Sequence, residues 1–518
     1  MATVEHIIPP TITADGSVHY SSVMSVDDSI AVCHMVPDRV VPVIFVPGVM
    51  GSNLMALATK TPMWLANSTW SVMKDWGGRG EEMRKRGFNP ATTDVYDGGT
   101  IPHGTTQTDT ELKRRGWGEV AYMSYGTFLP WLENALDDAD TCKTGLRAEL
   151  MRNLGDLVPG ISPLTNEEVA LSYKYQFPVH AVGYNWLQSN DVSAFRLKSK
   201  IVEFMKYYKD QNKKCDYVIL VTHSMGGLVS RWYSENLDGS DNVLGTVHAV
   251  MPTIGSATVY KRVKGGTEMP TGIVLGADAA EMTAVFGQSP GPLQLLPSLE
   301  YGLGWLQIRS GSESVNLPIS NPYKEIYLSR GQWWSLCDAK LINPLDTEKR
   351  TIDQDWASYT SLITNLVMPF HGGLIGKYHP NTYAFYGDDP AHKTWGNVVW
   401  EEEIDRVLKW TGAYSKVDDL KSGQVIEDTG TGDQKLLQRS AGDPMYTQYK
   451  LQPGDENGDG TVPVRSGAAP SGKIKLCVGH KDVDHEGAYK KTQQQMFALW
   501  AITKIAYGIK ETKMAYAA

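Results

Sequence analysis

The chain has 518 residues, more than one compact core usually holds, so a core with sizeable additions is expected. Lysine and arginine total 49 and aspartate and glutamate total 58, which gives a net charge of −9. Without a strong basic run, this charge argues against nucleic-acid binding and against tight adhesion to anionic membranes. The five cysteines are widely spaced, show no metal-ligand spacing and favour unpaired thiols in a reducing compartment.

The N-terminal residues lack the basic start and apolar run of a signal peptide. The longest apolar stretch, around residues 40–58, is interrupted by prolines and glycines, among them Pro42, Pro47 and Gly48. We therefore predict no membrane-spanning helix there. The sequence predicts a protein made in the cytoplasm without a cleaved leader, which would leave the cell only by a leaderless route.

Six short apolar runs predict the strands of one sheet. They lie at residues 43–46, 179–184, 217–222, 246–251, 383–386 and 474–478. Because the runs are continuous instead of alternating, they indicate strands buried on both faces, as in a parallel sheet. Apolar residues at helical spacing predict helices over 197–208, 228–233 and 489–507. The alternation of strand and helix predicts a doubly wound α/β fold.

Two long gaps separate the predicted strands. About 130 residues lie between the first two strands, and about 130 more lie between the strands near residues 250 and 384. These lengths are too great for plain connections, so they predict inserted cap or lid structures. We predict a discontinuous core over residues 1–58, 176–258 and 380–518, with a first insertion over 59–175 and a second over 259–379.

The most informative local feature surrounds Ser224. A predicted strand runs into His223-Ser224-Met225-Gly226-Gly227, and a predicted helix follows. On such a strand–turn–helix the serine oxygen projects above the sheet, so we predict Ser224 as a nucleophile. The backbone N–H of Met225, near the helix N-terminus, can stabilise an oxyanion. Thr222 replaces the first glycine of the common G-x-S-x-G pattern, and a serine that only caps the helix is the alternative.

A glycine-containing loop follows the first predicted strand. Gly48 and Gly51 allow the backbone of this loop to turn sharply and to approach a substrate. A second oxyanion donor is expected from the loop after an early strand, and we assign it to Met50, with Val49 next. By itself this motif would be only a glycine-rich turn.

A serine nucleophile in this frame needs an acid and then a histidine further along the chain. Asp459 lies in a glycine-rich segment and is the first candidate acid, while Asp388 is the alternative acid. His485 stands just before the last predicted helix, and His480 lies nearer the last strand. We predict Asp459 and His485 as the pair, with Asp388 and His480 as alternatives.

No metal ion or cofactor is expected. The segment from Asp455 begins like a calcium loop, but its twelfth residue is Ser466, where such a loop needs a bidentate glutamate. Acyl transfer through a serine needs neither a metal nor an organic cofactor.

Together these motifs resemble the lecithin:cholesterol acyltransferase-like branch of the α/β hydrolases, close to GPI-inositol-deacylase-like lipases. The matching pieces lie at residues 46–52, 64, 183–186, 223–227, 295–297 and 458–463. The resemblance implies an α/β-hydrolase fold, places a catalytic triad on Ser224, Asp459 and His485, and places the oxyanion donors on the two methionines already named. The sequence departs from the family pattern at Thr222, usually glycine, and at Asn185, usually acidic.

The resemblance implies a serine lipase or phospholipase that acts on a lipid ester at a membrane surface through an acyl-enzyme. A leaderless chain with these motifs also resembles type VI secretion lipase effectors. That likeness implies a toxin delivered to the envelope of a rival cell and a cognate immunity protein. Two alternatives stay open: a lipid acyltransferase that uses the same triad, and a non-catalytic hydrolase-fold protein that only binds a partner.

Overall fold

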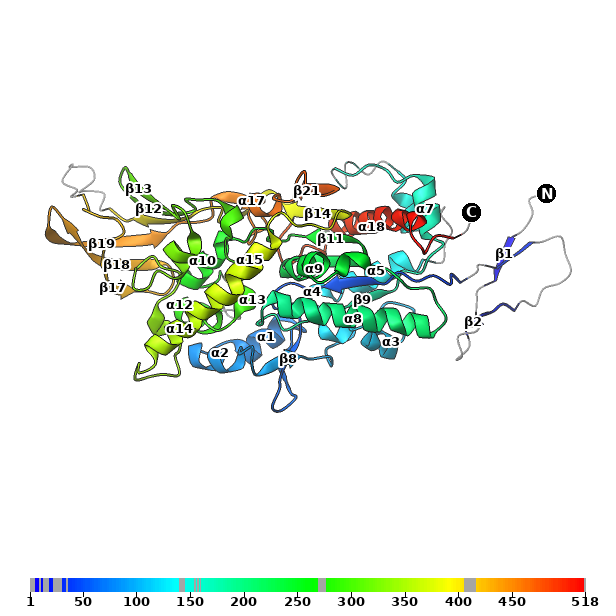
Figure 1. Ribbon diagram of the computed structural model, residues 1–518, viewed down its shortest axis with the longest axis horizontal. Helices are drawn as coiled ribbons and strands as arrows, with labels where there is room; N and C mark the ends of the chain where they lie inside the picture. The colour runs from blue at the N-terminus through cyan, green and yellow to red at the C-terminus, as the bar shows by residue number, and fades with distance from the viewer. Residues whose placement is uncertain are drawn as a thin grey trace.

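A six-stranded sheet forms the centre of the computed structural model (Figure 1). The structure describes residues 5–8, 11–12, 18–21, 30–33, 36–138, 145–152, 155, 158, 160–268, 276–404 and 416–516. The order across the sheet is β9 (Val179–Ala181), β5 (Val43–Val46), β10 (Val218–His223), β11 (Val243–Ala249), β14 (Thr382–Gly387) and β21 (Leu476–His480). All neighbouring strands are parallel. The six predicted runs are these six strands, and the predicted α/β fold is confirmed.

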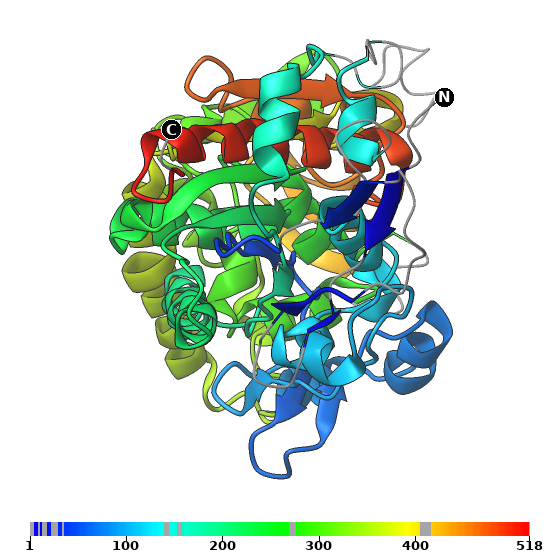
Figure 2. The ribbon, with the colours of Figure 1, turned by 90° about the vertical axis from the view of Figure 1, so that its right-hand side faces the viewer.

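Helices cover both faces of this sheet, which explains why its central strands are buried and largely apolar. Every residue of β5, β10 and β11 is buried. Helix α18 (Thr492–Tyr507) packs on one face, and α8 (Asn190–Asp210) and α9 (Met225–Asn236) lie on the other (Figure 2). The three helices predicted from apolar spacing are these three.

The direction of chain progression reverses between β5 and β10. From β5 the chain moves outward to β9, returns to β10 on the opposite side of β5, and then continues outward through β11, β14 and β21. The loops that follow β5 and β10 therefore diverge at the carboxyl ends of their strands. In open α/β sheets such a switch point is where ligands bind.

A second six-stranded sheet lies at the left-hand end of the molecule (Figure 1). Its order is β13 (Glu313–Leu317), β12 (Leu306–Ser310), β16 (Val398–Glu402), β19 (Asp443–Leu451), β18 (Asp433–Ser440) and β17 (Gln424–Asp428). Strands β16 to β19 fall within residues 380–518, which we grouped with the core, whereas β12 and β13 fall within the second insertion. Because β12 pairs directly with β16, the boundary drawn at residue 380 divides a single sheet.

Smaller elements fill the two long gaps between core strands. The first gap holds β6 (Leu54–Ala56), β7 (Pro62–Trp64), α1 (Thr69–Trp76), α2 (Glu81–Gly87), β8 (Thr93–Val95), α3 (Asp109–Arg114), α4 (Tyr122–Tyr125), α5 (Phe128–Leu136), α6 (Leu146–Glu149) and α7 (Asn166–Ser172). The second holds α10 (Ala257–Gly265), α12 (Ala279–Phe286), α13 (Pro290–Leu293), α14 (Ile352–Leu362) and α15 (Met368–Leu374). Near the C-terminal core lie β15 (Asp389–Thr394), β20 (Glu456–Gly458) and α17 (Val464–Gly467).

The N-terminal segment contributes two short pairs, β1 (Glu5–Ile8) with β4 (Ile30–Cys33) and β2 (Thr11–Ile12) with β3 (Val18–His19). Neither pair joins the central sheet. Among the residues that the structure describes, no helix combines the length and apolar character needed to cross a membrane.

Candidate active site

Ser224 occupies a sharp turn between β10 and α9. Its backbone has φ 51° and ψ −124°, a conformation that is disfavoured for a residue with a side chain. Two hydrogen bonds hold the turn, from the N–H of Ser224 to the carbonyl of Ala249 and from the N–H of Gly227 to the carbonyl of Ser224, each 2.9 Å long. This geometry presents the serine at the carboxyl end of β10, beside the switch point of the sheet.

The two glycines after Ser224 allow α9 to begin directly against the end of β5. A Cβ atom on Gly226 would lie 2.4 Å from the carbonyl oxygens of Val46 and Pro47. A Cβ atom on Gly227 would lie 2.6 Å from the sulfur of Met251. Neither position has room for a side chain, which accounts for the glycine pair in the motif.

Thr222, where the pattern usually has glycine, is accommodated by a buried histidine. Its hydroxyl lies 2.7 Å from Nδ1 of His248, and both side chains are buried. Burial, followed by the nearby Arg231 charge, lowers the pKa of His248 to about 3, so this histidine stays neutral. The hydroxyl thus has a hydrogen-bond partner, and the departure from glycine leaves the turn intact.

The structure brings Ser224, His485 and Asp459 together in a chain of hydrogen bonds. Nε2 of His485 lies 2.8 Å from Oγ of Ser224, although 261 positions separate the two residues. Nδ1 of His485 lies 2.8 Å from Oδ2 of Asp459. Because an ionised carboxylate only accepts hydrogen bonds, Nδ1 carries the proton and Nε2 is free to accept one from the serine.

The carboxylate of Asp459 is fixed by the backbone that follows it. Its second oxygen, Oδ1, accepts the N–H of Thr461 at 2.9 Å and the N–H of Val462 at 2.7 Å. The residue is 2% exposed. The Gly-Asp-Gly-Thr-Val motif therefore serves to aim one carboxylate oxygen at the histidine.

Met50 lies in the loop after β5 with φ 61°, in a turn that the N–H of Gly51 closes by donating to the carbonyl of Gly48 at 3.0 Å. The carbonyl of Met50 accepts the indole N–H of Trp64 at 2.8 Å, which fixes the peptide. Met225 is the first residue of α9. Within the described part of the chain, neither the Met50 N–H nor the Met225 N–H donates a hydrogen bond, so both can serve a ligand oxygen.

The structure brings neither alternative residue to the serine. Oδ1 of Asp388 accepts the side-chain amide of Asn457 at 3.0 Å instead of contacting His485. His480 is buried on β21, where its ring stacks on Phe385 with centroids 5.1 Å apart. Its two ring nitrogens have no hydrogen-bond partner among the described residues. This histidine is part of the core.

Buried neutral histidines make the fold sensitive to acid. Burial lowers the pKa of His480 and His371 to about 4 and that of His223 and His248 to about 3. In the unfolded chain these groups bind protons near the ordinary pKa of about 6.5, so stability falls as pH drops below that value. We expect His480 alone to remove roughly 2 kcal/mol of unfolding free energy between pH 7 and pH 5.

Chemical denaturation at pH 7 and pH 5 measures this loss in the wild type. The His480→Phe variant keeps the aromatic stacking but lacks the titrating group. The difference in unfolding free energy between pH 7 and pH 5 should therefore shrink by the share assigned to His480. An unchanged difference would show that His480 does not titrate on unfolding.

One group of side chains has the composition of a metal site. Oxygen or nitrogen atoms of Asp389, His392 and Asp482 lie within 4.8 Å of one another. Each carboxylate already has a partner, because Asp389 accepts the N–H of Asp482 at 2.6 Å and Asp482 pairs with Lys491 at 2.6 Å. These contacts account for the group without an ion, and we assign no metal to it.

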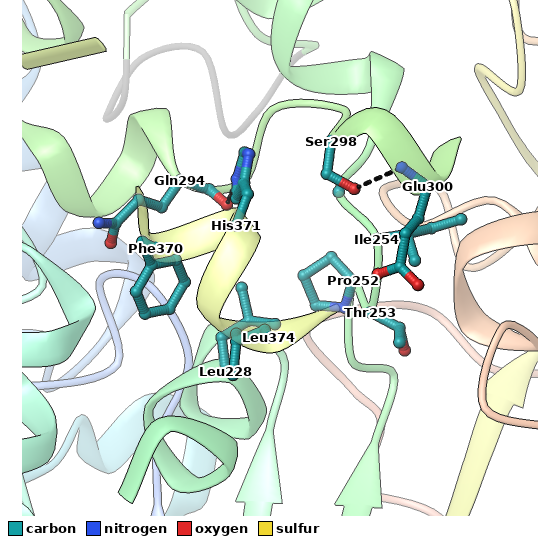
Figure 3. Close-up of a pocket in the computed structure, with 11 residues that line it drawn as sticks. Leu228, Pro252, Thr253, Ile254, Gln294, Ser298, Glu300, Phe370, His371 and Leu374 are labelled. Carbon is teal, nitrogen blue, oxygen red and sulfur yellow. Dashed lines mark hydrogen bonds between the residues drawn. The ribbon is translucent and has the colours of Figure 1, made fainter. Parts of the chain in front are cut away.

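A small pocket lies beside α9 (Figure 3). Leu228, one turn after Ser224, faces it together with Phe370 and Leu374 of α15. The lining does not include the serine, Asp459 or His485. Ser224 itself is only 3% exposed, so the candidate nucleophile is covered in this conformation.

Two buried residues beside the triad, His223 and Tyr125, were not predicted from the sequence as part of the site. His223 is adjacent to Ser224 in the chain, but among the described residues its ring makes no hydrogen bond to the serine hydroxyl. It contacts the His485 backbone and Tyr125 instead. No local pattern marks Tyr125, which lies 98 positions before His223 in the chain.

Comparisons with known proteins show what the chain as a whole is similar to. A model of the lecithin:cholesterol acyltransferase family matches residues 162–356. A solved structure described as the crystal structure of the Tle4-Tli4 complex is similar with a TM-score of 0.73 and 30% sequence identity. The match covers 90% of this chain and 98% of that chain. No curated protein matches.

Proposed function

This chain belongs to the Tle4 family of lecithin:cholesterol acyltransferase-like α/β hydrolases, and we propose that it is a serine lipase or phospholipase. The observation that carries the proposal is the hydrogen-bonded chain Ser224–His485–Asp459 at the carboxyl end of β10. A nucleophile within reach of a base, and a base oriented by a third group, is the arrangement that acyl transfer requires.

The proposed first step is attack on the ester carbonyl. His485 takes the proton of Ser224 as Oγ bonds to the carbonyl carbon, and Asp459 stabilises the imidazolium that forms. The N–H groups of Met50 and Met225 stabilise the negative oxygen of the tetrahedral intermediate. When this intermediate collapses, the C–O bond to the alcohol breaks and His485 protonates the leaving oxygen.

The second step releases the fatty acid. Water gives a proton to His485 and attacks the acyl-serine through the same oxyanion contacts. The acid then departs, and the proton returns to Ser224. No step in this sequence uses a metal ion or a cofactor.

A long-chain lipid ester, with phospholipid first, is the proposed substrate. Support comes from the family and from the long segments inserted between core strands. Since Ser224 is only 3% exposed, a covering segment must move before a lipid can enter. We therefore expect hydrolysis of a soluble ester to rise sharply once its concentration passes the micelle threshold. A rate that shows no rise there would count against a lid.

Labelling with a fluorophosphonate tests the central claim. The probe should form one covalent adduct, mapped to Ser224 by mass spectrometry, and vesicles of defined phospholipid should release fatty acid. A folded wild-type protein that does not react with the probe would support the alternative, a hydrolase-like scaffold that only binds a partner.

An acyltransferase is the second candidate, favoured by the lecithin:cholesterol acyltransferase match over residues 162–356. In that case an alcohol replaces water in the second step. Product analysis with and without a sterol or a long-chain alcohol separates the two. If the acceptor leads to a new ester and to less free fatty acid, the protein is a transferase. If the release of fatty acid is unchanged, it is a hydrolase.

We further propose that the protein acts as an antibacterial effector that a cognate immunity protein neutralises. The supporting observation is that the similar Tle4 structure is a complex with Tli4. Expression directed to the bacterial periplasm should inhibit growth, whereas the Ser224→Ala variant should not. Growth inhibition by both forms, or by neither, would contradict an effector role through lipid hydrolysis.

A further inference from the structure

A buried chain of hydrogen bonds joins the loop after β5 to the loop that carries His485. The N–H of Gly48 donates to the hydroxyl of Tyr125 at 3.1 Å. That hydroxyl lies 2.9 Å from Nδ1 of His223, and Nε2 of His223 lies 2.7 Å from the backbone carbonyl of His485. Tyr125 and His223 are 3% and 6% exposed, so water does not compete for these bonds.

The chemistry of the groups fixes the direction of every bond in the chain. The carbonyl of His485 only accepts, so Nε2 of His223 carries a proton and donates it. Burial lowers the pKa of His223 to about 3, so the ring is neutral and its Nδ1 is an acceptor. The Tyr125 hydroxyl therefore donates to Nδ1, and its oxygen is left to accept the N–H of Gly48.

The packing around this chain leaves no room for a side chain at Gly48 or Gly51. A Cβ atom on Gly48 would lie 2.8 Å from Nδ1 of His223 and 3.0 Å from Cβ of Ser224. A Cβ atom on Gly51 would lie 2.7 Å from the Tyr125 hydroxyl. The glycines that flank Met50 are thus required for the loop to reach the buried tyrosine and histidine.

The His485 residue is held on both sides by this arrangement. Its N–H donates to the carbonyl of Asp459 at 2.9 Å, while its carbonyl accepts from His223. The imidazole is therefore attached to a backbone that is fixed at both ends. Through Tyr125, the same chain fixes the Gly48 peptide, two residues before Met50.

We propose that His223 and Tyr125 are positioning residues, which hold the His485 backbone and the oxyanion loop in one fixed arrangement around Ser224. This inference rests on the proposed function of the triad. Neither residue touches the reacting atoms, so each acts through the group that it holds. A displacement of about 1 Å in a reacting group can lower a rate by about 100-fold, so even a small relaxation of either loop should be measurable.

The Tyr125→Phe variant removes only the hydroxyl from the chain. Tyr489→Phe is the matched control, because Tyr489 is also buried against Phe45 and donates its hydroxyl to a backbone carbonyl, that of Thr222 at 3.0 Å. Active sites are counted with a fluorophosphonate, and kcat and KM for a short soluble ester are expressed per titrated site. We expect kcat to fall by about tenfold or more in Tyr125→Phe, with KM within about twofold of wild type.

Two variants at position 223 distinguish positioning from a purely structural role. His223→Gln can still donate to the His485 carbonyl, whereas His223→Leu can neither donate nor accept. We expect kcat per titrated site to be highest in the wild type, lower in His223→Gln and lowest in His223→Leu. A structural role would lower the number of titrated sites and the melting temperature and leave kcat per site unchanged. Should His223→Leu fail to fold, Tyr125→Phe and His223→Gln decide the question.

The inference is overturned if kcat per titrated site in Tyr125→Phe and His223→Gln stays within about twofold of wild type. It is also overturned if Tyr489→Phe loses as much activity as Tyr125→Phe. Failure of the proposed function looks different, because then the wild type itself shows no probe adduct at Ser224 and no ester hydrolysis.

Discussion

Replacement of Ser224 by alanine is expected to lower kcat for ester hydrolysis by about a millionfold. In the proposed mechanism the hydroxyl oxygen forms the bond to the acyl carbon, and no other group within the triad can take its place. Removal of the nucleophile from a Ser-His-Asp triad costs about that factor in subtilisin, and the residual rate there comes from the oxyanion hole and from substrate binding. The fold should persist, since the strained turn is held by backbone hydrogen bonds.

Ser230→Ala is the matched control for this variant. Ser230 lies on α9, the helix that begins directly after Ser224. It is fully buried, and its hydroxyl has no partner among the described residues. Both variants lose a serine hydroxyl, but only one should lose activity. Ester hydrolysis and probe labelling are compared at equal amounts of folded protein. Turnover in Ser224→Ala within tenfold of wild type would remove the serine from the mechanism.

The sequence predicted the central sheet because burial on both faces leaves a strong local signal. A strand such as β10 is buried over its whole length and begins with four apolar residues, so a run of apolar residues marks it. Most strands of the second sheet leave no such signal. In β18 buried residues alternate with exposed or half-buried ones, a period-2 pattern that is easily lost among polar residues. Strands β12 and β16 pair although about 90 residues separate them, and neither segment by itself predicts this pairing.

The parts of the candidate site that follow from local geometry could be predicted from the sequence. The turn at Ser224 follows from a strand, a small-residue motif and a helix in order, and the order of acid and histidine follows from the fold. The loops that hold Asp459 and His485 then mark these residues as candidates, and in the structure Asp459 contacts His485 and His485 contacts Ser224. Tyr125 could not be found in this way, because its role depends on a tertiary contact with His223 and not on any neighbour in sequence.

The Asp459→Asn variant should lower kcat by about ten-thousandfold while the protein stays folded. The reason lies in the two N–H groups, of Thr461 and Val462, that point at Oδ1. They require an acceptor, so the amide oxygen of asparagine must take that place and its NH₂ group must face Nδ1 of His485. A donor at that position forces Nδ1 to be unprotonated and puts the proton on Nε2. The histidine then presents a hydrogen to the Ser224 hydroxyl and cannot remove its proton.

Asp455→Asn serves as the control, because this aspartate lies in the same segment and accepts the N–H groups of Gly396 and Asn397 without contacting His485. Melting temperature and kcat per titrated site are measured for both variants. If the wrong tautomer is the cause, Asp459→Asn should lose activity with a nearly unchanged melting temperature, and Asp455→Asn should keep kcat. If Asp459→Asn stays within about tenfold of wild type, the carboxylate does not set the tautomer of His485. The base would then have to be oriented by its backbone alone, held between the carbonyl of Asp459 and the ring of His223.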